Sequence, residues 1–470
     1  MIFPTIQFAA FFALVLPISW LLMPFQRSWK VFIIAASYFF YGNADWHFVF
    51  LLAGCTVWNQ LLAVVIARRA VADRMRSWLL AVALIGDLCL LGWFKYYSFF
   101  AGNVATLTAK LGLAAPLPLL QVALPVGISF YTFQAMSYVI DVRRGRSAPA
   151  GWLDFALYAS FFPHLIAGPI VRATELIPQF ASPRDPGRIE AARAFELIVG
   201  GLIKKVVLAD TLSTQLVDPV FGSPAVHSRA DVIAAVFGYA VQIYCDFSAY
   251  SDMAIGLALL LGFQFPANFN RPYAAVTLTD FWRRWHMSLS RWLRDYLYIG
   301  LGGNRKGRLR TYANLMLTML LGGLWHGAAW KFMLWGGMHG SGLAAERWVD
   351  ERHGRRGAPV RWPVVRWFIT FMLVCVAWVF FRADSLDTVG EMAQRVLYGG
   401  GSTVLTPALV AAIAGGLALQ FVPEPPVVQA RLLFARIGAV PQGIVLASVL
   451  VITGALVGSQ GVPPFIYYQF

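Results

Sequence analysis

Charged side chains are scarce in this sequence. Asp, Glu, Lys and Arg make up 13% of its 470 residues, against roughly 25% in an ordinary soluble domain. Hydrophobic residues make up 59%, and the mean hydropathy is +0.63. This composition excludes a soluble globular protein and predicts a chain whose apolar surface faces lipid.

Cysteine is also rare, and the chain lacks the common catalytic motifs. Its four cysteines are scattered singly in apolar stretches, with no CxxC pair and no Cys/His cluster at metal-binding spacing. We therefore expect no disulfide framework and no metal site, and interpret the cysteines as small buried apolar residues (Cys55, Cys89, Cys245 and Cys375). A P-loop, a GxGxxG fingerprint, a GxSxG elbow and an HExxH motif are all missing.

The net charge of +15 does not indicate a nucleic-acid-binding protein. Lys and Arg cluster between apolar runs, as in loops that face a cytoplasm and anionic headgroups. The densest cluster, residues 271–310, holds nine Lys or Arg residues and two Asp residues. Near the N-terminus the first positive charges, Arg27 and Lys30, follow the apolar run, which favours a retained first span over a cleaved signal.

The apolar runs predict an all-α polytopic membrane protein with roughly 10–12 hydrophobic helices. Prolines such as Pro125 and Pro163 interrupt some runs and indicate re-entrant pieces, because broken helices are tolerated where protein or a water-filled cavity surrounds them. The predicted membrane segments are residues 3–23, 31–41, 46–67, 78–94, 117–140, 152–171, 195–210, 232–264, 311–340, 364–381, 404–422 and 441–460.

One of these segments carries an unexpected ionisable group. From Thr311 to Trp330 there is no Lys, Arg, Asp or Glu, and the run is long enough to cross a bilayer, yet it contains His326. Ionisable groups at membrane depth are costly and are therefore functional by default. Because neutral imidazole accepts a proton near neutral pH, His326 is the first candidate for chemistry.

The basic region before this segment predicts one amphipathic helix. Thr277 and Asp280 form a capping box at its start, and glycines 300, 302 and 303 end it. Its apolar stripe consists of large side chains at three- and four-residue steps (Trp282, Trp285, Leu289, Trp292, Leu293 and Tyr296). His286 falls on this inward face, as either a hydrogen-bonded core residue or a catalyst. The arginines off the stripe either lie on the membrane surface or bind phosphates.

Two other polar groups interrupt apolar runs. Asp246 and Asp252, six residues apart, point in different directions around a helix and are not an acid/base pair; Asp246 needs a partner, an Arg or a His, from another helix. His164 lies between two prolines, where it either caps a broken helix or lines a pore.

Five motifs together resemble the membrane-bound O-acyltransferases, and within them the bacterial alginate O-acetylation branch. They are LPVGISFYTFQAMSYVIDVRRG (124–145), FFPHLIAGPIVR (161–172), YCDFSAYSDMAIGL (244–257), FNRPYAAVTLTDFWRRWHMSLSRWLRDYLYIGLGGNRKG (269–307) and LTMLLGGLWHGAAW (317–330). The resemblance implies one integral-membrane domain over residues 1–470, with a core at about 90–345, C-terminal helices at 364–460 and a central tunnel through the bilayer.

The resemblance also implies an activity. An acetyl group would pass from cytoplasmic acetyl-CoA, which is a substrate rather than a permanently bound cofactor, across the bacterial inner membrane. It would then decorate an exopolysaccharide such as alginate or cellulose, with periplasmic SGNH-type acetyltransferases and an exopolysaccharide synthesis complex as partners.

Within the family, the invariant histidine matches His326, and a more variable position, often Asn, Asp or His, matches His286. His326 is the expected base, and His286, the Trp325 indole or a backbone amide would stabilise the oxyanion. Arg283, Arg284 and Lys306 are the expected contacts to CoA phosphates. Two alternatives stay open: a transporter or flippase of an acyl or sugar carrier, with His326 and Asp246 as a proton relay, and a scaffold that recruits a periplasmic enzyme.

Overall fold

A computed structural model of the chain describes residues 3, 5–70, 72–113, 117–118, 120, 122–353, 362–437, 441–442, 445 and 448. Helices dominate this part of the chain, and its β structure is an isolated bridge between His227 and Ser402. The chain divides into two compact units, Met1–Ile189 with Leu257–Pro266, and Glu190–Gly256 with Ala267–Phe470. The prediction of one integral-membrane domain stays a prediction.

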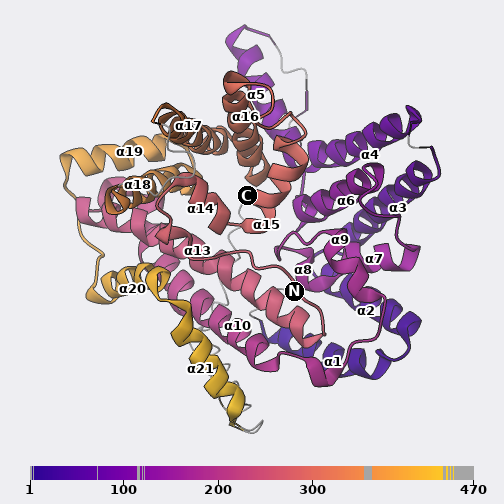
Figure 1. Cartoon of the computed structure of the whole chain (residues 1–470). Coiled ribbons are helices and arrows are strands. Elements are labelled where there is room, and N and C mark those ends of the chain that lie inside the picture. Colours follow the sequence, from indigo (N-terminus) through magenta and orange to yellow (C-terminus); the bar gives the residue numbers. More distant parts are fainter. Residues whose placement is uncertain are drawn as a thin grey trace. The chain divides into compact units, whose positions relative to one another are not determined.

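The first unit is built from helices of the N-terminal third. They are α1 (Ile6–Leu22), α2 (Gln26–Gly42), α3 (His47–Ala67), α4 (Met75–Leu91), the π-helical turn Gly92–Tyr96, α5 (Tyr97–Lys110), α6 (Ile128–Arg143), α7 (Trp152–Ser160), α8 (Phe162–Leu165), α9 (Ala173–Leu176) and the 3-10 turns Ile177–Phe180 and Pro186–Arg188. Figure 1 shows α3, α4 and α6 side by side.

Helix α6 forms the centre of this unit. Every residue from Ile128 to Val142 is buried, because α3 and α4 pack against it. Gly127 precedes α6 with φ 75°, and a Cβ there would lie 2.6 Å from the carbonyl oxygen of Leu165. Only glycine fits this left-handed position and close approach, so the turn into α6 depends on it.

The second unit contains the remaining helices. They are α10 (Ala191–Ile203), the π-helix Lys204–Ala209, α11 (Asp210–Leu212), the π-helix Ser213–Val217, α12 (Asp218–Gly222), the 3-10 turn Pro224–Val226, α13 (Arg229–Leu260, shared with the first unit), the 3-10 turn Pro272–Ala274, α14 (Leu278–Arg284), α15 (Met287–Trp292), the π-helix Leu293–Tyr298, α16 (Arg308–His326), α17 (Trp330–Arg352), α18 (Pro363–Arg382), α19 (Leu386–Tyr398), α20 (Pro407–Ala418), the 3-10 turn Leu419–Phe421 and α21 (Glu424–Arg436).

Glycines allow α16 and α17 to pack closely in this unit (Figure 1). A Cβ on Gly336 would collide with the carbonyl of Met319, and one on Gly340 would lie 2.9 Å from the sulfur of Met316. Small residues at four-residue spacing let helix backbones approach in this way, as is common in membrane proteins. The backbones of α16 and α17 therefore lie close together around His339.

The prediction of an all-α membrane protein is confirmed. Among the described residues, four stretches are long and apolar enough to cross a membrane: His47–Ala67, Met75–Lys110, Arg229–Leu260 and Pro363–Arg382. The predicted segment 311–340 is wrong as a single span, because Gly327 to Ala329 separate α16 from α17. Most of the predicted segment 441–460 lies outside the described residues, and the predicted tunnel stays a prediction.

Candidate active site

His326 is the last residue of α16. Its side chain is buried, with 4% of the residue exposed. Unsatisfied carbonyl groups give the C-terminal end of a helix a partial negative charge, which stabilises a cation there. His326 therefore lies at the negative end of the α16 dipole.

The turn after His326 depends on glycine. A Cβ on Gly327 would collide with the ring of Phe332, and a Cβ on Gly323 would collide with the carbonyl of the same residue. The Phe332 ring also packs 5.0 Å from Phe381, so it has little room to move. The LWHG sequence thus ends the helix at the histidine and brings α17 back against it.

His286 lies at a break between two short helices. The sequence predicts one continuous helix here, which is wrong: α14 ends at Arg284, and α15 starts at Met287. His286 itself has φ 41° and ψ 55°, a left-handed conformation that stops the helix. Its predicted burial on the inward face is confirmed, because the residue is 0% exposed.

Asn268 fixes the tautomer of His286. The Nδ1–H of His286 donates to Oδ1 of Asn268 at 3.2 Å, while Nδ2 of Asn268 donates to Ser251 at 3.0 Å. The same Oδ1 accepts from the backbone N–H and the hydroxyl of Ser288, at 3.2 and 2.9 Å. Nε2 of His286 therefore carries a lone pair. Burial lowers the pKa of His286 to about 3, so the ring is neutral at physiological pH.

Aromatic rings connect the two histidines. The Trp325 ring centroid lies 6.0 Å from His286 and 5.0 Å from His326. On its other sides His326 contacts Trp335 at 5.1 Å and Phe381 at 5.2 Å. The predicted residues His286, Trp325 and His326 thus form one apolar cluster within the second unit, which excludes bulk water from the imidazoles.

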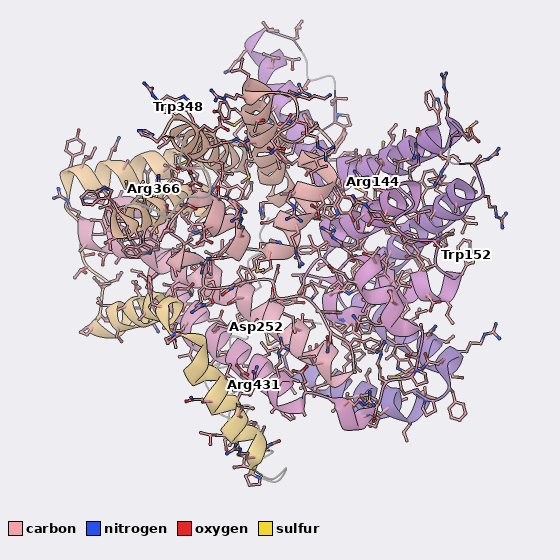
Figure 2. The ribbon with its side chains drawn as sticks, viewed as in Figure 1. Arg144, Trp152, Asp252, Trp348, Arg366 and Arg431 are labelled. Carbon is pink, nitrogen blue, oxygen red and sulfur yellow. The ribbon has the colours of Figure 1, made fainter. Side chains whose placement is uncertain are left out.

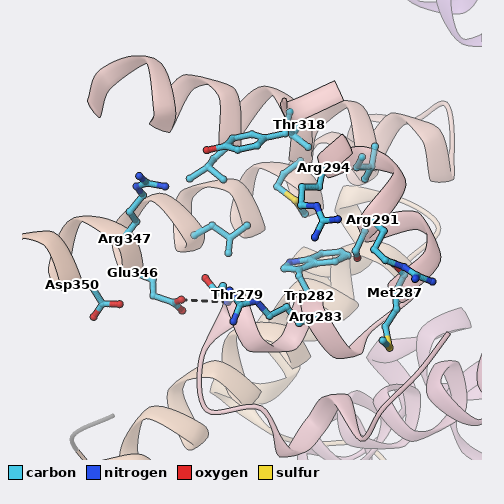
Figure 3. Close-up of a pocket in the computed structure, with 16 residues that line it drawn as sticks. Thr279, Trp282, Arg283, Met287, Arg291, Arg294, Thr318, Glu346, Arg347 and Asp350 are labelled. Carbon is cyan, nitrogen blue, oxygen red and sulfur yellow. Dashed lines mark hydrogen bonds between the residues drawn. The ribbon is translucent and has the colours of Figure 1, made fainter. Parts of the chain in front are cut away.

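A cavity of about 690 Å³ lies beside this cluster, between α14, α15, the following π-helix, α16 and α17. Figure 3 shows Glu346, Arg347 and Asp350 at one end, Met287, Arg291 and Arg294 at the other, and Trp282 between them. Glu346 also accepts from the backbone N–H groups of Leu278 and Thr279, at 2.7 and 3.3 Å, so it holds the start of α14 against α17. The cavity therefore has charged ends and an aromatic middle.

Of the three predicted phosphate contacts, one lines this cavity and two do not. Arg283 lines it, whereas Arg284 is not among its lining residues and pairs with Asp280 at 2.9 Å. Lys306 lies in the exposed turn before α16 and also does not line it. Arg291 and Arg294, two of the arginines off the stripe for which phosphate binding stayed open, also line it, and so does Arg347, which sequence reasoning missed. The last comes from α17, which no local pattern links to the basic region.

Sequence reasoning also missed His339. It lies on α17, is 0% exposed, and packs against Trp335 at 4.9 Å and Trp282 at 5.1 Å. The signal was present: like His326, His339 is an ionisable residue in the apolar run 311–340. A ring between the cavity and the His326 cluster, however, is recognisable only from the packing of α14 against α17.

The two aspartates of α13 are paired with lysines. Lys205 contacts Asp246 at 2.9 Å and Asp210 at 2.7 Å, and Lys204 pairs with Asp252, which Figure 2 labels. The predicted need for a partner on Asp246 is confirmed, but the partner is a lysine and not the expected Arg or His. These ion pairs join the π-helix Lys204–Ala209 to α13 and give both aspartates a structural role.

The remaining polar predictions concern His164 and the cysteines. Nε2 of His164 donates to the carbonyl of Tyr158 in the last turn of α7 at 3.0 Å, which confirms that it caps a broken helix. Three cysteines are buried as predicted, but Cys89 is exposed on α4, so its predicted burial is wrong. Within the described ranges, no group of His, Cys, Asp and Glu residues is arranged to hold a metal ion.

The fold is that of a helical membrane protein with buried histidines in its second unit. Comparison with known families identifies which one: the model of the membrane-bound O-acyltransferase family matches residues 83–385. The chain belongs to this family and is a membrane O-acyltransferase.

The names of its relatives describe the transfer of acetyl or D-alanyl groups and mention alginate, peptidoglycan and teichoic acid. The chain is 44% identical over 370 residues to the probable alginate O-acetylase AlgI of Pseudomonas syringae pv. tomato, covering 78% of this chain and 70% of that protein. It is 38% identical over 398 residues to the peptidoglycan O-acetyltransferase of Helicobacter pylori, with coverages of 79% and 73%. The teichoic acid D-alanyltransferase of Streptococcus thermophilus is 29% identical over 280 residues, with coverages of 54% and 68%.

Proposed function

We propose that this protein transfers an acetyl group from acetyl-CoA to a hydroxyl group destined for an exopolysaccharide, of which alginate is the first candidate. The observation that carries the proposal is the cluster of His286, Trp325 and His326 beside a cavity with arginines in its wall. The identity to alginate and peptidoglycan O-acetylating proteins supports acetyl as the acyl group.

His326 acts as the base in this proposal. The acceptor hydroxyl attacks the thioester carbonyl, His326 takes its proton, and the C–S bond breaks to give an O-acetyl ester. The proton then passes from His326 to the departing thiolate, so a thiol is released. General-base assistance of this kind contributes about 10²- to 10⁴-fold, and the end of α16 stabilises the transient imidazolium.

His286 orients the acceptor rather than the oxyanion. With Nδ1–H bound to Asn268, its Nε2 accepts a hydrogen bond and does not donate one. The donor that an oxyanion requires is therefore the Trp325 indole or a backbone amide, two of the three groups expected from the sequence. In this assignment His326 removes the proton and His286 orients the acceptor, and both rings contact Trp325.

The anionic part of the donor binds at the arginines of the cavity. Arg283, Arg291 and Arg347 line it, and guanidinium groups match phosphate oxygens in pairs. Arg284 and Lys306 belong to the same basic region and contribute to its positive field. We further propose that the enzyme lies in the bacterial inner membrane and hands acetyl groups to a periplasmic SGNH-type acetyltransferase or to the polymer within a synthesis complex.

His326→Ala tests the proposal. Purified protein in proteoliposomes is given [¹⁴C]acetyl-CoA on one side and alginate oligosaccharide on the other, and O-acetyl ester and free thiol are measured together. We expect a rate loss of at least about 10²-fold with unchanged yield of folded protein. His47→Ala, which changes an exposed histidine outside the cluster, is the matched control.

Transport of an intact carrier is the competing function. A transporter would move label across the membrane without release of thiol. The thioester would stay intact in the His326→Ala variant under either function, so the wild-type protein must separate the two. Ester formation and thiol release in equal amounts therefore support the acetyltransferase, whereas acetylation at the wild-type rate by His326→Ala would remove the role given to this histidine.

A further inference from the structure

Four ring nitrogens near the cavity are buried without a hydrogen bond. They are Nε1 of Trp282, Nε1 of Trp335, and both Nδ1 and Nε2 of His339, none of which has a partner among the described residues. A buried donor or acceptor without a partner costs about 1–3 kcal/mol. Native proteins keep such groups rarely, and a cluster of them calls for an explanation.

The three rings pack against one another. Trp282 lies 5.7 Å from Trp335 and 5.1 Å from His339, and Trp335 lies 4.9 Å from His339. Because all three pairs are in contact, their nitrogens belong to one small region and not to separate defects. We refer to Trp282, Trp335 and His339 as the indole–imidazole cluster.

The cluster lies between the cavity and His326. On α17, Trp335, His339 and Leu343 follow at four-residue steps and so share one helix face. Trp335 contacts the His326 ring at one end of this face, while Leu343 and Asp350 line the cavity at the other. From Trp335 to Asp350 the helix rises by roughly 20 Å. A molecule that extended from the charged end of the cavity along this helix face to His326 would therefore meet His339.

The ring nitrogens of the cluster that lack hydrogen bonds determine which chemical group would bind there. Indole N–H groups only donate, while a neutral imidazole donates from one nitrogen and accepts at the other. An amide meets both needs, because its carbonyl accepts and its N–H donates. A hydrocarbon chain would satisfy neither, and a phosphate would offer no donor to the imidazole.

We propose that the indole–imidazole cluster binds an amide in the thioester-bearing arm of the acyl donor. This inference rests on the proposed function, which requires a thioester to reach His326. His339 and Trp282 are then donor-binding residues that hold the arm in line with the base. Coenzyme A and an acyl carrier protein both carry such an arm, and the cluster recognises what they share.

The test compares two acetyl thioesters: S-acetylpantetheine and an analogue in which the amide nearest the sulfur is replaced by two methylene groups. Thiol release is measured with purified protein and alginate oligosaccharide. For wild type we expect kcat/KM to fall about tenfold when the amide is removed. His339→Leu should react equally with both compounds, and His339→Asn, which keeps a donor and an acceptor, should recover part of the preference.

Two further variants keep the test decisive. Trp282→Phe removes one indole N–H while keeping an aromatic ring, so it should reduce the amide preference even if His339→Leu folds poorly. His353→Leu alters an exposed histidine at the end of the same helix and should leave the preference at the wild-type value. In donor-free protein, His339→Leu should melt no lower than wild type, because it removes a buried group without a partner.

An unchanged amide preference in both His339→Leu and Trp282→Phe would overturn this inference and leave the proposed function standing. An absence of thioester cleavage by the wild-type protein would instead overturn the proposed function, and this inference with it. Comparing acetyl-CoA with an acetylated acyl carrier protein, in wild type and His339→Leu, then distinguishes the natural source of the arm.

Discussion

Asn268 determines what His286 can do, although it belongs to no recognisable motif by itself. Its side-chain oxygen accepts three hydrogen bonds, one from the His286 ring and two from Ser288. A single amide thereby fixes the ring tautomer and holds the break between α14 and α15. Burial keeps the pKa of His286 near 3, so the stability contributed by the neutral ring is complete above pH 6.5 and declines as pH falls toward 3.

Asn268→Asp should change the pH dependence of the reaction. The new carboxylate keeps the oxygen that binds Nδ1 but adds a negative charge beside the ring, which raises the pKa of His286 from about 3. As pH falls, the variant's imidazole is protonated earlier, so kcat/KM should decline at a higher pH than in wild type. The measurement is a pH profile of thiol release between pH 4.5 and 8, a range chosen around the ordinary histidine pKa of about 6.5.

Superimposable profiles for wild type and Asn268→Asp would show that His286 does not act as a neutral acceptor. Asn59→Asp is the comparison variant. Asn59 is also buried and donates a hydrogen bond to Asp87, but it belongs to the first unit. It should leave the pH profile of the remaining activity in place.

Single residues were predictable where the sequence context is unusual. His326 stood out because a long uncharged run isolates it, and His286 because it falls on an apolar stripe. Asn268 and His339 were missed for a physical reason: their importance lies in contacts with residues of other elements. A polar side chain gains a partner, or lacks one, only when the helices have packed.

At the scale of the element, periodicity predicted where helices exist and failed to show where they break. The stripe from Trp282 to Tyr296 suits one helix, yet the chain turns at His286. The run 311–340 suits one span, yet it turns at Gly327. Both breaks bring a histidine to a helix end, and both are fixed by tertiary contacts that hydrophobic periodicity does not contain.

The α16–α17 turn offers a test at this scale. Gly327→Ala should destabilise the protein by about 1–3 kcal/mol, because the added methyl group collides with the ring of Phe332. It should also lower kcat by moving His326 out of place. Thermal unfolding in detergent and acetyl transfer are the two measurements.

Phe332→Leu provides the matched compensation. Combined with Gly327→Ala, it should restore part of the stability, because the smaller side chain makes room for the methyl group. Gly390→Ala is the control, since a Cβ at that position on α19 meets no neighbouring atom. Equal melting temperatures for wild type and Gly327→Ala would contradict the collision.

At the scale of the whole molecule, basic loops predict which side of the membrane each connection occupies. Helix α3 is long and apolar enough to cross a membrane, so we expect its two ends on opposite faces. The loop after it, around Arg69, is basic, whereas the loop before it, around Ala44, is not. Under the positive-inside rule we expect the loop around Arg69 on the cytoplasmic side, and the same rule predicts that side for the basic region that contains Arg305.

Single cysteines in a cysteine-free background test this topology. Arg69→Cys and Arg305→Cys should react with an impermeant maleimide in inside-out vesicles, and Ala44→Cys in right-side-out vesicles. Labelling of Arg69→Cys and Arg305→Cys from opposite sides would exclude a common cytoplasmic face, and with it the entry of the donor beside Arg283.

The fold class was predictable because it depends on composition and on the length of the apolar segments, both of which can be read from the sequence. The motifs from 124–145 to 317–330 then identified the family that the match to residues 83–385 shows. The ion pairs of Asp246 and the cavity were not predictable in the same way. They depend on which face of the π-helix Lys204–Ala209, of α14 or of α17 meets a neighbour.

The backbone at His286 limits what protein engineering can place there. With φ 41°, the position accepts glycine readily, and among other residues it favours Asn, Asp and His, whose short polar side chains tolerate this conformation. Most members of a saturation library at this codon would therefore carry about 1–2 kcal/mol of backbone strain. A library of these few residues would sample acceptor preference while keeping the fold, and would separate the chemistry of the side chain from the shape of the turn.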